Sequence, residues 1–303
     1  SVEYIMRDVD YGWVIRYIHT TGASLFFAVI YLHMFRGLLY GSYQKPKELV
    51  WVFGCTIYLA MMAEGFLGYV LPYGQMSYWG AQVIISLFGA IPYIGESLEL
   101  WVRGDYYISG ITISRFFALH VVALPLVLIA LVFLHLVALH EVGAGNPEGV
   151  DIEAHLDDDG VPLDSVPFFP YKVLNALVGI GVFMTVFSVI MFFFPEGGGY
   201  FIEMANFQEA NPLVTPEHIA PVWYYAPFYT MLRAIPDPLG GLVVMGSAVA
   251  IFFVVPWLDR SNVASIRYKG LYSKIALTMF GVSFITLGYL GTVGVTEIRK
   301  TMS

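Results

Sequence analysis

Residues 14–39 read VIRYIHTTGASLFFAVIYLHMFRGLL, a largely apolar stretch that contains His19 and His33. The stretch is long enough to cross the roughly 30 Å hydrocarbon core of a membrane as one α-helix. The two histidines are fourteen residues apart. On a helix they therefore return to within roughly 40° of one face and lie about 21 Å apart along the axis. This stretch predicts a transmembrane helix that presents two imidazoles at two membrane depths.

A second apolar stretch repeats this pattern. Residues 111–139 read ITISRFFALHVVALPLVLIALVFLHLVAL and contain His120 and His135, fifteen residues apart. Their separation along a helix is about 22 Å. Ionisable side chains at membrane depth are rare and usually functional. Four of the seven histidines in the chain fall in these two pairs. They predict two metal centres stacked across a bilayer, as in a di-haem protein with two histidines per iron.

The order of the spans predicts which histidines face one another. One apolar span, residues 51–71, separates the two histidine helices, so both helices cross the membrane in the same direction. His19 is then expected at the depth of His120, and His33 at the depth of His135. Zinc suits the pattern less well, because the two histidines of one helix are too far apart to share an ion. The alternative without a metal is that neighbouring side chains hydrogen-bond each histidine.

The composition supports a membrane protein. Of 303 residues, 58% are hydrophobic and only 13% are charged, which is typical of several membrane spans. The net charge of −8 argues against a nucleic-acid partner. The single cysteine, Cys55, lies in a predicted span, so no disulfide or iron–sulfur site is expected within this chain. An aromatic content of 17% suits interfacial belts and packing around flat cofactors.

The predicted fold class is all-α: an integral membrane helical bundle with a di-haem four-helix core and short interfacial helices. Glycine and proline breaks in residues 72–110 and 195–238 predict such short helices at the membrane surface. Residues 141–170 are acidic and predict a solvent-exposed loop. Six transmembrane helices are expected, at residues 13–39, 48–71, 111–139, 172–194, 239–258 and 272–291.

Glycines and arginines accompany the histidines. Gly54 and Gly68 on the second span are also fourteen residues apart, and small residues allow a helix or a flat macrocycle to approach closely. Arg16, Arg36 and Arg115 lie within five residues of a histidine. Because guanidinium groups pair with carboxylates, these arginines are candidates to bind haem propionates. The alternatives are ordinary helix packing for the glycines and interface anchoring for the arginines.

The second histidine pair predicts a distortion of its helix. On a regular α-helix, a residue fifteen positions after a histidine lies about 60° past the face of that histidine. A residue fourteen positions after it lies about 40° short of that face. Pro125 lacks a backbone N–H and crowds the preceding turn. We therefore expect a kink or π-bulge within about five residues of Pro125.

Several motifs together resemble cytochrome b of the cytochrome bc complex, the quinol:cytochrome c oxidoreductase. The resemblance covers nearly the whole chain and fits the fused proteobacterial type, without the family's first and last transmembrane helices. The motifs are RYIH (16–19), HMFRG (33–37), GYVLPYGQMSYWGA (68–81), IPYIG (91–95), RFFALH (115–120), HLVALHE (135–141), PVWY (221–224) and LRAIPDPLGG (232–241).

The resemblance implies a membrane oxidoreductase that works by a Q cycle. It would oxidise quinol at one membrane face and pass electrons through two b-type haems to a quinone-reduction site, contributing to the proton-motive force. The low-potential haem would be bound by His19 and His120, and the high-potential haem by His33 and His135. The quinone would be ubiquinone or another quinone. Implied partners are a Rieske iron–sulfur protein, a membrane-anchored c-type cytochrome and a second copy of the complex.

The resemblance also implies two quinone sites and a location. The chain would lie in the bacterial inner membrane, with the mitochondrial inner membrane as the alternative. Residues 1–170 would form the haem-binding bundle, and residues 171–303 a C-terminal helical part with the quinol-site segment 195–238. His140 matches a position at the reduction pocket. Positions that match the oxidation pocket, where an inhibitor of the methoxyacrylate kind would meet Gly80, are Phe66, Gly80, Pro221, Trp223, Tyr224 and Tyr229.

The chain departs from the family pattern in its proton-handling groups. Val222 replaces the glutamate of the Pro-x-Trp-Tyr motif, and Ala176 stands where an acidic residue is expected early in the fourth span. Glu64 lies four residues before Gly68, on nearly the same helical face. This places Glu64 at the membrane depth expected for the first haem and the oxidation pocket. A carboxylate at that depth costs free energy unless it is paired, hydrated or functional. We therefore predict that Glu64 accepts a quinol proton; the alternative is a neutral glutamate hydrogen-bonded to a neighbouring helix.

Two other functions fit parts of the pattern. A membrane anchor or transporter could use the histidines as a proton relay, and it would show no haem absorbance. A di-haem anchor of a dehydrogenase would show haem bands. It would not need the structured segments 72–110 and 195–238 or the Pro-x-Trp-Tyr motif.

Overall fold

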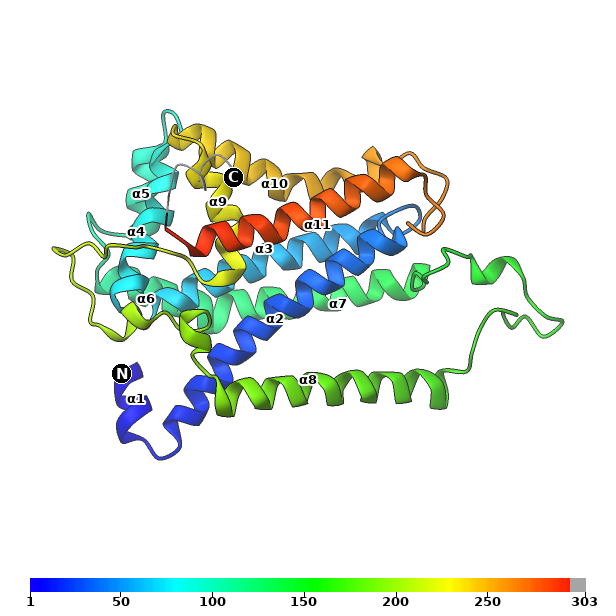
Figure 1. Cartoon of the computed structure of the whole chain (residues 1–303), viewed down its shortest axis with the longest axis horizontal. Coiled ribbons are helices and arrows are strands. Elements are labelled where there is room, and N and C mark those ends of the chain that lie inside the picture. Colours follow the sequence, from blue (N-terminus) through cyan, green and yellow to red (C-terminus); the bar gives the residue numbers. More distant parts are fainter. Residues whose placement is uncertain (295–303) are drawn as a thin grey trace.

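A computed structural model describes residues 1–294, which fold into an all-helical bundle (Figure 1). Six helices are long and apolar enough to cross a membrane, which confirms the predicted number. Their ends agree with the predicted ends to within four residues. The six are α2 (Gly12–Tyr40), α3 (Glu48–Val70), the continuous helix α6–α7 (Gly110–Val142), the helix ending in α8 (Phe168–Phe193), α10 (Pro238–Leu258) and α11 (Leu271–Thr292).

The short helices gather at one end of the bundle (Figure 1). They are α1 (Val2–Asp8), α4 (Gln75–Gly89), α5 (Gly95–Arg103) and α9 (Ala226–Ala234). The connections between α2 and α3, α7 and α8, and α10 and α11 lie at the other end (Figure 1). Helices α2 and α7 therefore run in the same direction, as the span order predicts. The acidic segment after α7 is an exposed loop, also as predicted.

Four helix pairings organise the bundle. Helix α3 packs along α7, α9 packs against α10 and α11, and α8 contacts α2. Helix α8 begins after residue 170, where the second of the two predicted parts of the chain starts. Within the described residues, α8 nevertheless packs against α2, which belongs to the first part, and against the turn that precedes it. The division of the chain into two parts at that residue stays a prediction.

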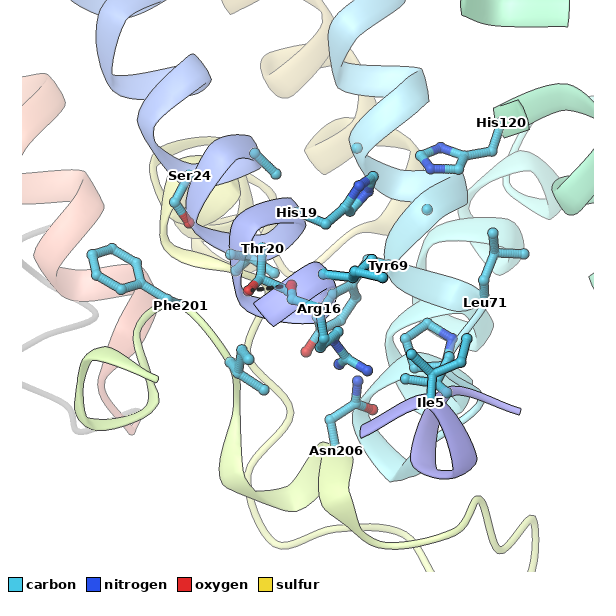
Figure 2. Close-up of a pocket in the computed structure, with 18 of the residues that line it drawn as sticks. Ile5, Arg16, His19, Thr20, Ser24, Tyr69, Leu71, His120, Phe201 and Asn206 are labelled. Atoms are coloured by element: carbon cyan, nitrogen blue, oxygen red, sulfur yellow. Dashed lines mark hydrogen bonds between the residues drawn. The ribbon is translucent and has the colours of Figure 1, made fainter. Parts of the chain in front are cut away.

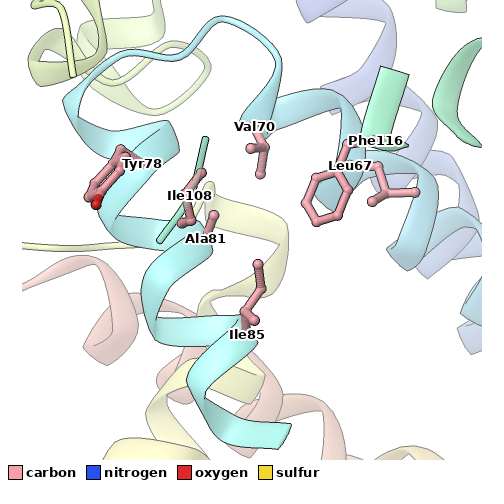
Figure 3. Packing of buried hydrophobic residues seen from close by; sticks show 7 residues of the cluster. All are labelled: Leu67, Val70, Tyr78, Ala81, Ile85, Ile108 and Phe116. Atoms are coloured by element: carbon pink, nitrogen blue, oxygen red, sulfur yellow. The ribbon is translucent and has the colours of Figure 1, made fainter. Parts of the chain in front are cut away.

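A buried apolar cluster fixes the short helices against the membrane spans (Figure 3). Helix α6 begins with a capping box, in which the Ser109 hydroxyl accepts from the backbone N–H of Ile111 and the Thr112 hydroxyl from that of Ser109. The cap fixes where the third span starts. The cluster joins the end of α3 to α4 and α6 and consists of Leu67, Val70, Tyr78, Ala81, Ile85, Ile108 and Phe116.

The third span contains the predicted distortion. Residues Leu119–Ala123 form a π-helical turn between α6 and α7, directly before Leu124 and Pro125. A π-turn accommodates one extra residue within a helix. The fifteen-residue spacing therefore still lets His120 and His135 face the same neighbours, and the prediction of a kink or π-bulge near Pro125 is confirmed.

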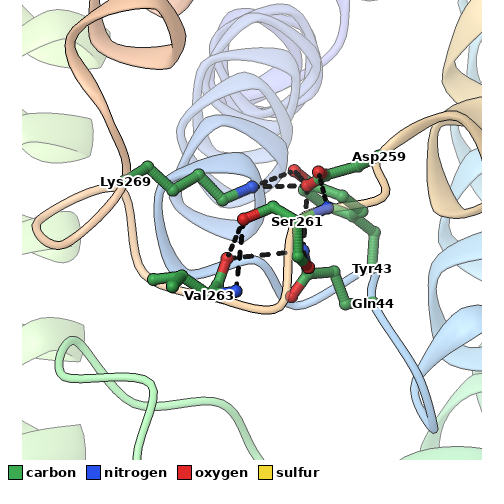
Figure 4. Close-up of polar contacts among 6 residues, drawn as sticks. All are labelled: Tyr43, Gln44, Asp259, Ser261, Val263 and Lys269. Carbon is green, nitrogen blue, oxygen red and sulfur yellow. Dashed lines mark hydrogen bonds and ion pairs between the residues drawn. The ribbon is translucent and has the colours of Figure 1, made fainter.

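A polar cluster ties together two connections at the opposite end (Figure 4). The Asp259 carboxylate accepts hydrogen bonds from Tyr43 (2.7 Å) and from Gln44 (2.9 Å), and it forms an ion pair with Lys269. Burial alone would raise the pKa of Asp259, but the bonds from Lys269 and Tyr43 outweigh it and lower the pKa from 3.8 to about 2. The paired carboxylate therefore stabilises the fold above pH 4, and this contribution is lost as the pH falls from 4 to 2.

Replacing Asp259 with alanine is expected to lower the thermal unfolding temperature, because it leaves the Lys269 ammonium unpaired where that side chain is only 7% exposed. Breaking such a pair costs about 3–5 kcal/mol. The control is Glu148→Gln, which breaks the exposed pair with Arg267 and should leave the unfolding temperature unchanged. Equal unfolding temperatures for the Asp259 variant and the unmodified protein would contradict this assignment.

Candidate haem centre

The four histidines form two facing pairs. The ring centroids of His19 and His120 are 6.0 Å apart, and those of His33 and His135 are 6.5 Å apart. Figure 2 shows His19 and His120 pointing toward one another from different helices. A metal about 2 Å from one nitrogen of each ring separates two opposed imidazoles by about 6 Å between centroids. Helix α2 and the continuous helix α6–α7 thus hold two pairs of imidazoles, each at a separation that suits one metal.

The second nitrogen of His120 faces α3. Its Nδ1 lies 3.0 Å from the backbone oxygen of Glu64 and 2.9 Å from the Oε1 atom of the same residue. Ligand histidines usually hold their other ring nitrogen in such a bond, which fixes the tautomer and the ring orientation. With Nδ1 engaged, Nε2 is the nitrogen left for a metal.

Two glycines of α3 lie directly under the α7 imidazoles. A Cβ atom added to Gly68 would be 2.4 Å from Cε1 of His120, and one added to Gly54 would be 3.3 Å from Cε1 of His135. The fourteen-residue spacing of these glycines therefore matches the two depths of the histidines. The paired imidazoles and the bare glycine backbone would suit a haem whose iron is held by one histidine from each helix. No group of three metal-ligating side chains is present in residues 1–294.

The three candidate arginines have different surroundings. Arg16 lines a cavity together with His19 and His120. The guanidinium of Arg36 lies over the ring of Tyr40, 5.2 Å from its centroid. Arg115 donates to the backbone oxygen of Trp101 at 2.8 Å, an interaction that joins α6 to α5. Arg16 is therefore the arginine that the structure places in the cavity of the first histidine pair.

This first cavity has a volume of about 290 Å³ and lies at the end of the bundle that carries the short helices (Figure 2). Side chains from α1, α2, α3 and the segment after α8 surround it. Val222 and Tyr224 form part of its wall, next to the His19–His120 pair. Because both imidazoles and Gly68 also line it, this cavity is the space that a haem bound by the first histidine pair would fill.

The other residues predicted for the oxidation pocket do not gather around this cavity. Trp223 lines a second, apolar cavity of about 500 Å³, and Pro221 lines a third of about 240 Å³. Tyr229 donates to the backbone oxygen of Ile219 at 3.0 Å. Phe66 packs on Phe116, and nothing lies within 4 Å of where a Cβ of Gly80 would be. None of these last three predicted residues lines one of the three cavities.

The remaining candidates lie at opposite ends of the molecule. His140 is at the end of α7 far from the first cavity, and its Nδ1 lies 2.9 Å from the backbone oxygen of Leu136. Glu64 does not line the first cavity, although its neighbour Gly65 does. One of its carboxylate oxygens, Oε2, is buried without a hydrogen-bond partner.

Sequence reasoning missed the residues that hold the Pro-x-Trp-Tyr segment in place. The ring of Tyr224 stacks on Phe27 at 4.0 Å with an interplanar angle of 5°. The hydroxyl of Tyr31 donates to the backbone oxygen of Tyr224. Both partners lie on the histidine helix α2, on a face that reads in the sequence as ordinary apolar packing. No local signal distinguishes them.

Sequence reasoning also missed Glu203 and His218. Both line the third cavity, which shares Phe201 and Val222 with the first. Burial raises the pKa of Glu203, and the nearby His218 opposes that shift. Val222 thus stands between the first cavity and a pair of ionisable groups. Because these groups lie in an irregular segment, spacing could not reveal them.

Comparison with known proteins gives the same assignment along the whole chain. Residues 1–143 match the family model described as Cytochrome b/b6/petB, and residues 209–303 match the one described as Cytochrome b(C-terminal)/b6/petD. Cytochrome b of Allochromatium vinosum is 58% identical over 100% of this chain and 75% of its own length. Cytochrome b of Rhodospirillum rubrum is 48% identical over 100% and 72%.

A solved structure has the same fold. A chain of a hyperthermophilic respiratory Complex III superposes with a TM-score of 0.91 at 35% identity, covering 99% of this chain and 76% of that one. With the paired histidines, the glycines beneath them and this likeness, the chain belongs to the cytochrome b family.

Proposed function

We propose that this chain is the cytochrome b subunit of a quinol:cytochrome c oxidoreductase of the bacterial inner membrane. The proposal rests on two pairs of facing imidazoles, whose ring centroids are 6.0 and 6.5 Å apart. Helix α2 and the continuous helix α6–α7 hold these pairs at two depths. Two bound b-type haems would supply one-electron transfer across the membrane. The proposed partners are a Rieske iron–sulfur protein, a membrane-anchored c-type cytochrome and a second copy of the complex.

Different residues of the chain would act at the two membrane faces. His19 and His120 would hold a haem in the first cavity, which both imidazoles line, and His33 and His135 would hold a haem toward the other face. Arg16 would pair with a propionate at the first centre, since it lines that cavity. An apolar wall orients a quinone ring, and a few polar groups receive its protons.

The quinol-oxidising segment would be residues 221–229, which carries Tyr224 and Tyr229. The stacking of Tyr224 on Phe27 keeps this segment against α2, beside the first cavity. Pro221 restricts the backbone that leads into it. At the opposite end, His140 would serve the reduction of ubiquinone or another quinone.

The test is steady-state reduction of cytochrome c by a short-chain ubiquinol, using the purified complex in detergent. We expect turnover that depends on both the quinol and the Rieske protein. Normal haem bands without any quinol oxidation would reject this function and favour a dehydrogenase anchor. Absence of haem bands would favour a proton-relay membrane protein.

Replacing Gly80 with alanine is expected to weaken inhibition by a methoxyacrylate far more than it slows turnover. The methyl group itself meets nothing within 4 Å in the protein, so the fold tolerates it. A rigid ligand that occupied this open space would clash with it. Inhibitor titrations of the two proteins measure the effect, and unchanged potency would remove Gly80 from the pocket.

Replacing Glu64 with glutamine is expected to slow quinol oxidation at saturating quinol, because we propose that its carboxylate accepts a quinol proton in place of the glutamate absent at Val222. The buried oxygen Oε2, which has no hydrogen-bond partner, would be the accepting atom. Adding Val222→Glu should restore part of the rate, because Val222 lines the first cavity directly. Full turnover of the single variant from pH 6 to 9 would exclude this role.

A further inference from the structure

Helix α3 carries different side chains next to the two histidine pairs. Each pair lies over a glycine of α3, Gly68 for His120 and Gly54 for His135. Four residues before each glycine, and so one helical turn away, stand Glu64 and Val50. The two centres therefore share one scaffold and differ at an equivalent position, where one has a carboxyl side chain and the other an apolar side chain.

At the first centre the carboxylate contacts the ligand histidine directly. Oε1 of Glu64 lies 2.9 Å from Nδ1 of His120, and the two side chains are only 15% and 16% exposed. The Nδ1–H group can donate to this oxygen and to the backbone oxygen of Glu64. Shielding from water strengthens such an interaction.

At the second centre no carboxylate takes this place. In the described part of the chain, Nδ1 of His135 is buried without a side-chain hydrogen-bond partner. The backbone of Val50, whose side chain is apolar, lies close to the His135 ring. His120 and His135 thus differ in whether a carboxyl group lies next to the second ring nitrogen.

We propose that Glu64 lowers the one-electron reduction potential of the centre held by His19 and His120 relative to the centre held by His33 and His135. A carboxylate that accepts from a ligand's N–H makes the imidazole a stronger electron donor, which favours the more positively charged, oxidised metal. The resulting difference directs electrons away from the first cavity and toward the opposite face. This inference rests on the proposed function, because it requires a haem at each pair.

The experiment is a potentiometric titration of the two haem bands in the purified complex. In Glu64→Gln, the first band should be reduced at a higher potential while the second band keeps its midpoint. We expect the oxidised-to-reduced ratio at fixed potential to change at least ten-fold, which is about 59 mV for one electron. The reciprocal variant Val50→Glu should lower the midpoint of the second band alone.

Glu217→Gln is the matched control, since it removes one exposed carboxylate from the same end of the molecule and should shift neither band. Unchanged midpoints in both Glu64→Gln and Val50→Glu would overturn the proposal, as would equal shifts in Glu64→Gln and Glu217→Gln. Val222→Glu, added to Glu64→Gln, should leave the raised midpoint in place even where it restores turnover. A wild-type complex with fewer than two bands would reject the proposed function instead.

Discussion

Replacing His120 with leucine is expected to remove one of two haems, abolish quinol oxidation and leave the other haem band in place. Leucine fills the space of the imidazole but offers no nitrogen to a metal, so His19 alone would remain at that centre. His135 lies on the same continuous helix about 22 Å away, roughly three turns beyond the π-turn, and keeps its partner His33. Visible spectra and haem content of the purified variant measure the result.

Matched variants test the pairing itself. His19→Leu should reproduce the His120 result, and His33→Leu or His135→Leu should remove the other band. A double variant of His19 and His33 should lose both bands, since these residues belong to different centres. Loss of only one band in that double variant would contradict the pairing of α2 with α7.

Replacing Gly68 with alanine is expected to disrupt the first centre almost as severely. The new Cβ would lie 2.4 Å from Cε1 of His120, about 1 Å inside ordinary contact distance, so the ring or the helix must move. Metal ligation depends on ring position, and a displacement of this size moves the nitrogen away from the metal. The first haem band should be lost, and the second should remain.

Gly54→Ala is the natural control for this variant. Its Cβ would lie 3.3 Å from Cε1 of His135, so a shift of a few tenths of an ångström relieves the contact. We expect both haem bands to persist in Gly54→Ala. Normal haem content in Gly68→Ala, or equal damage in the two variants, would show that the glycines do not act through the imidazoles.

The sequence predicted what depends on regular helical geometry. Rotation and rise per residue brought His19 opposite His120 and His33 opposite His135, and the extra residue before His135 required the π-turn at Leu119–Ala123. Long apolar helices in a membrane leave few other arrangements, because every backbone polar group must be satisfied within the helix.

The sequence did not predict the contacts made by irregular segments and flexible side chains. Arg115 meets the Trp101 carbonyl, and the oxidation-pocket candidates lie around several cavities, because these positions depend on how segments 72–110 and 195–238 fold over the bundle. Glu64 was placed at the correct depth, but its contact with His120 depends on the rotation of α3 against α7. Periodicity within one helix does not determine that rotation.

The most direct test of the two haem centres is the haem content per chain, measured together with the visible spectrum. The proteins to compare are the wild type, the four single histidine variants and the His19/His33 double variant. We expect two b-type haems in the wild-type protein, with separate midpoint potentials. We also expect one haem in each single variant, with the same band lost in the His19 and His120 variants and the other in the His33 and His135 variants. The double variant should contain none. One haem per wild-type chain, or loss of the same band in the His19 and His33 variants, would contradict the two centres described here.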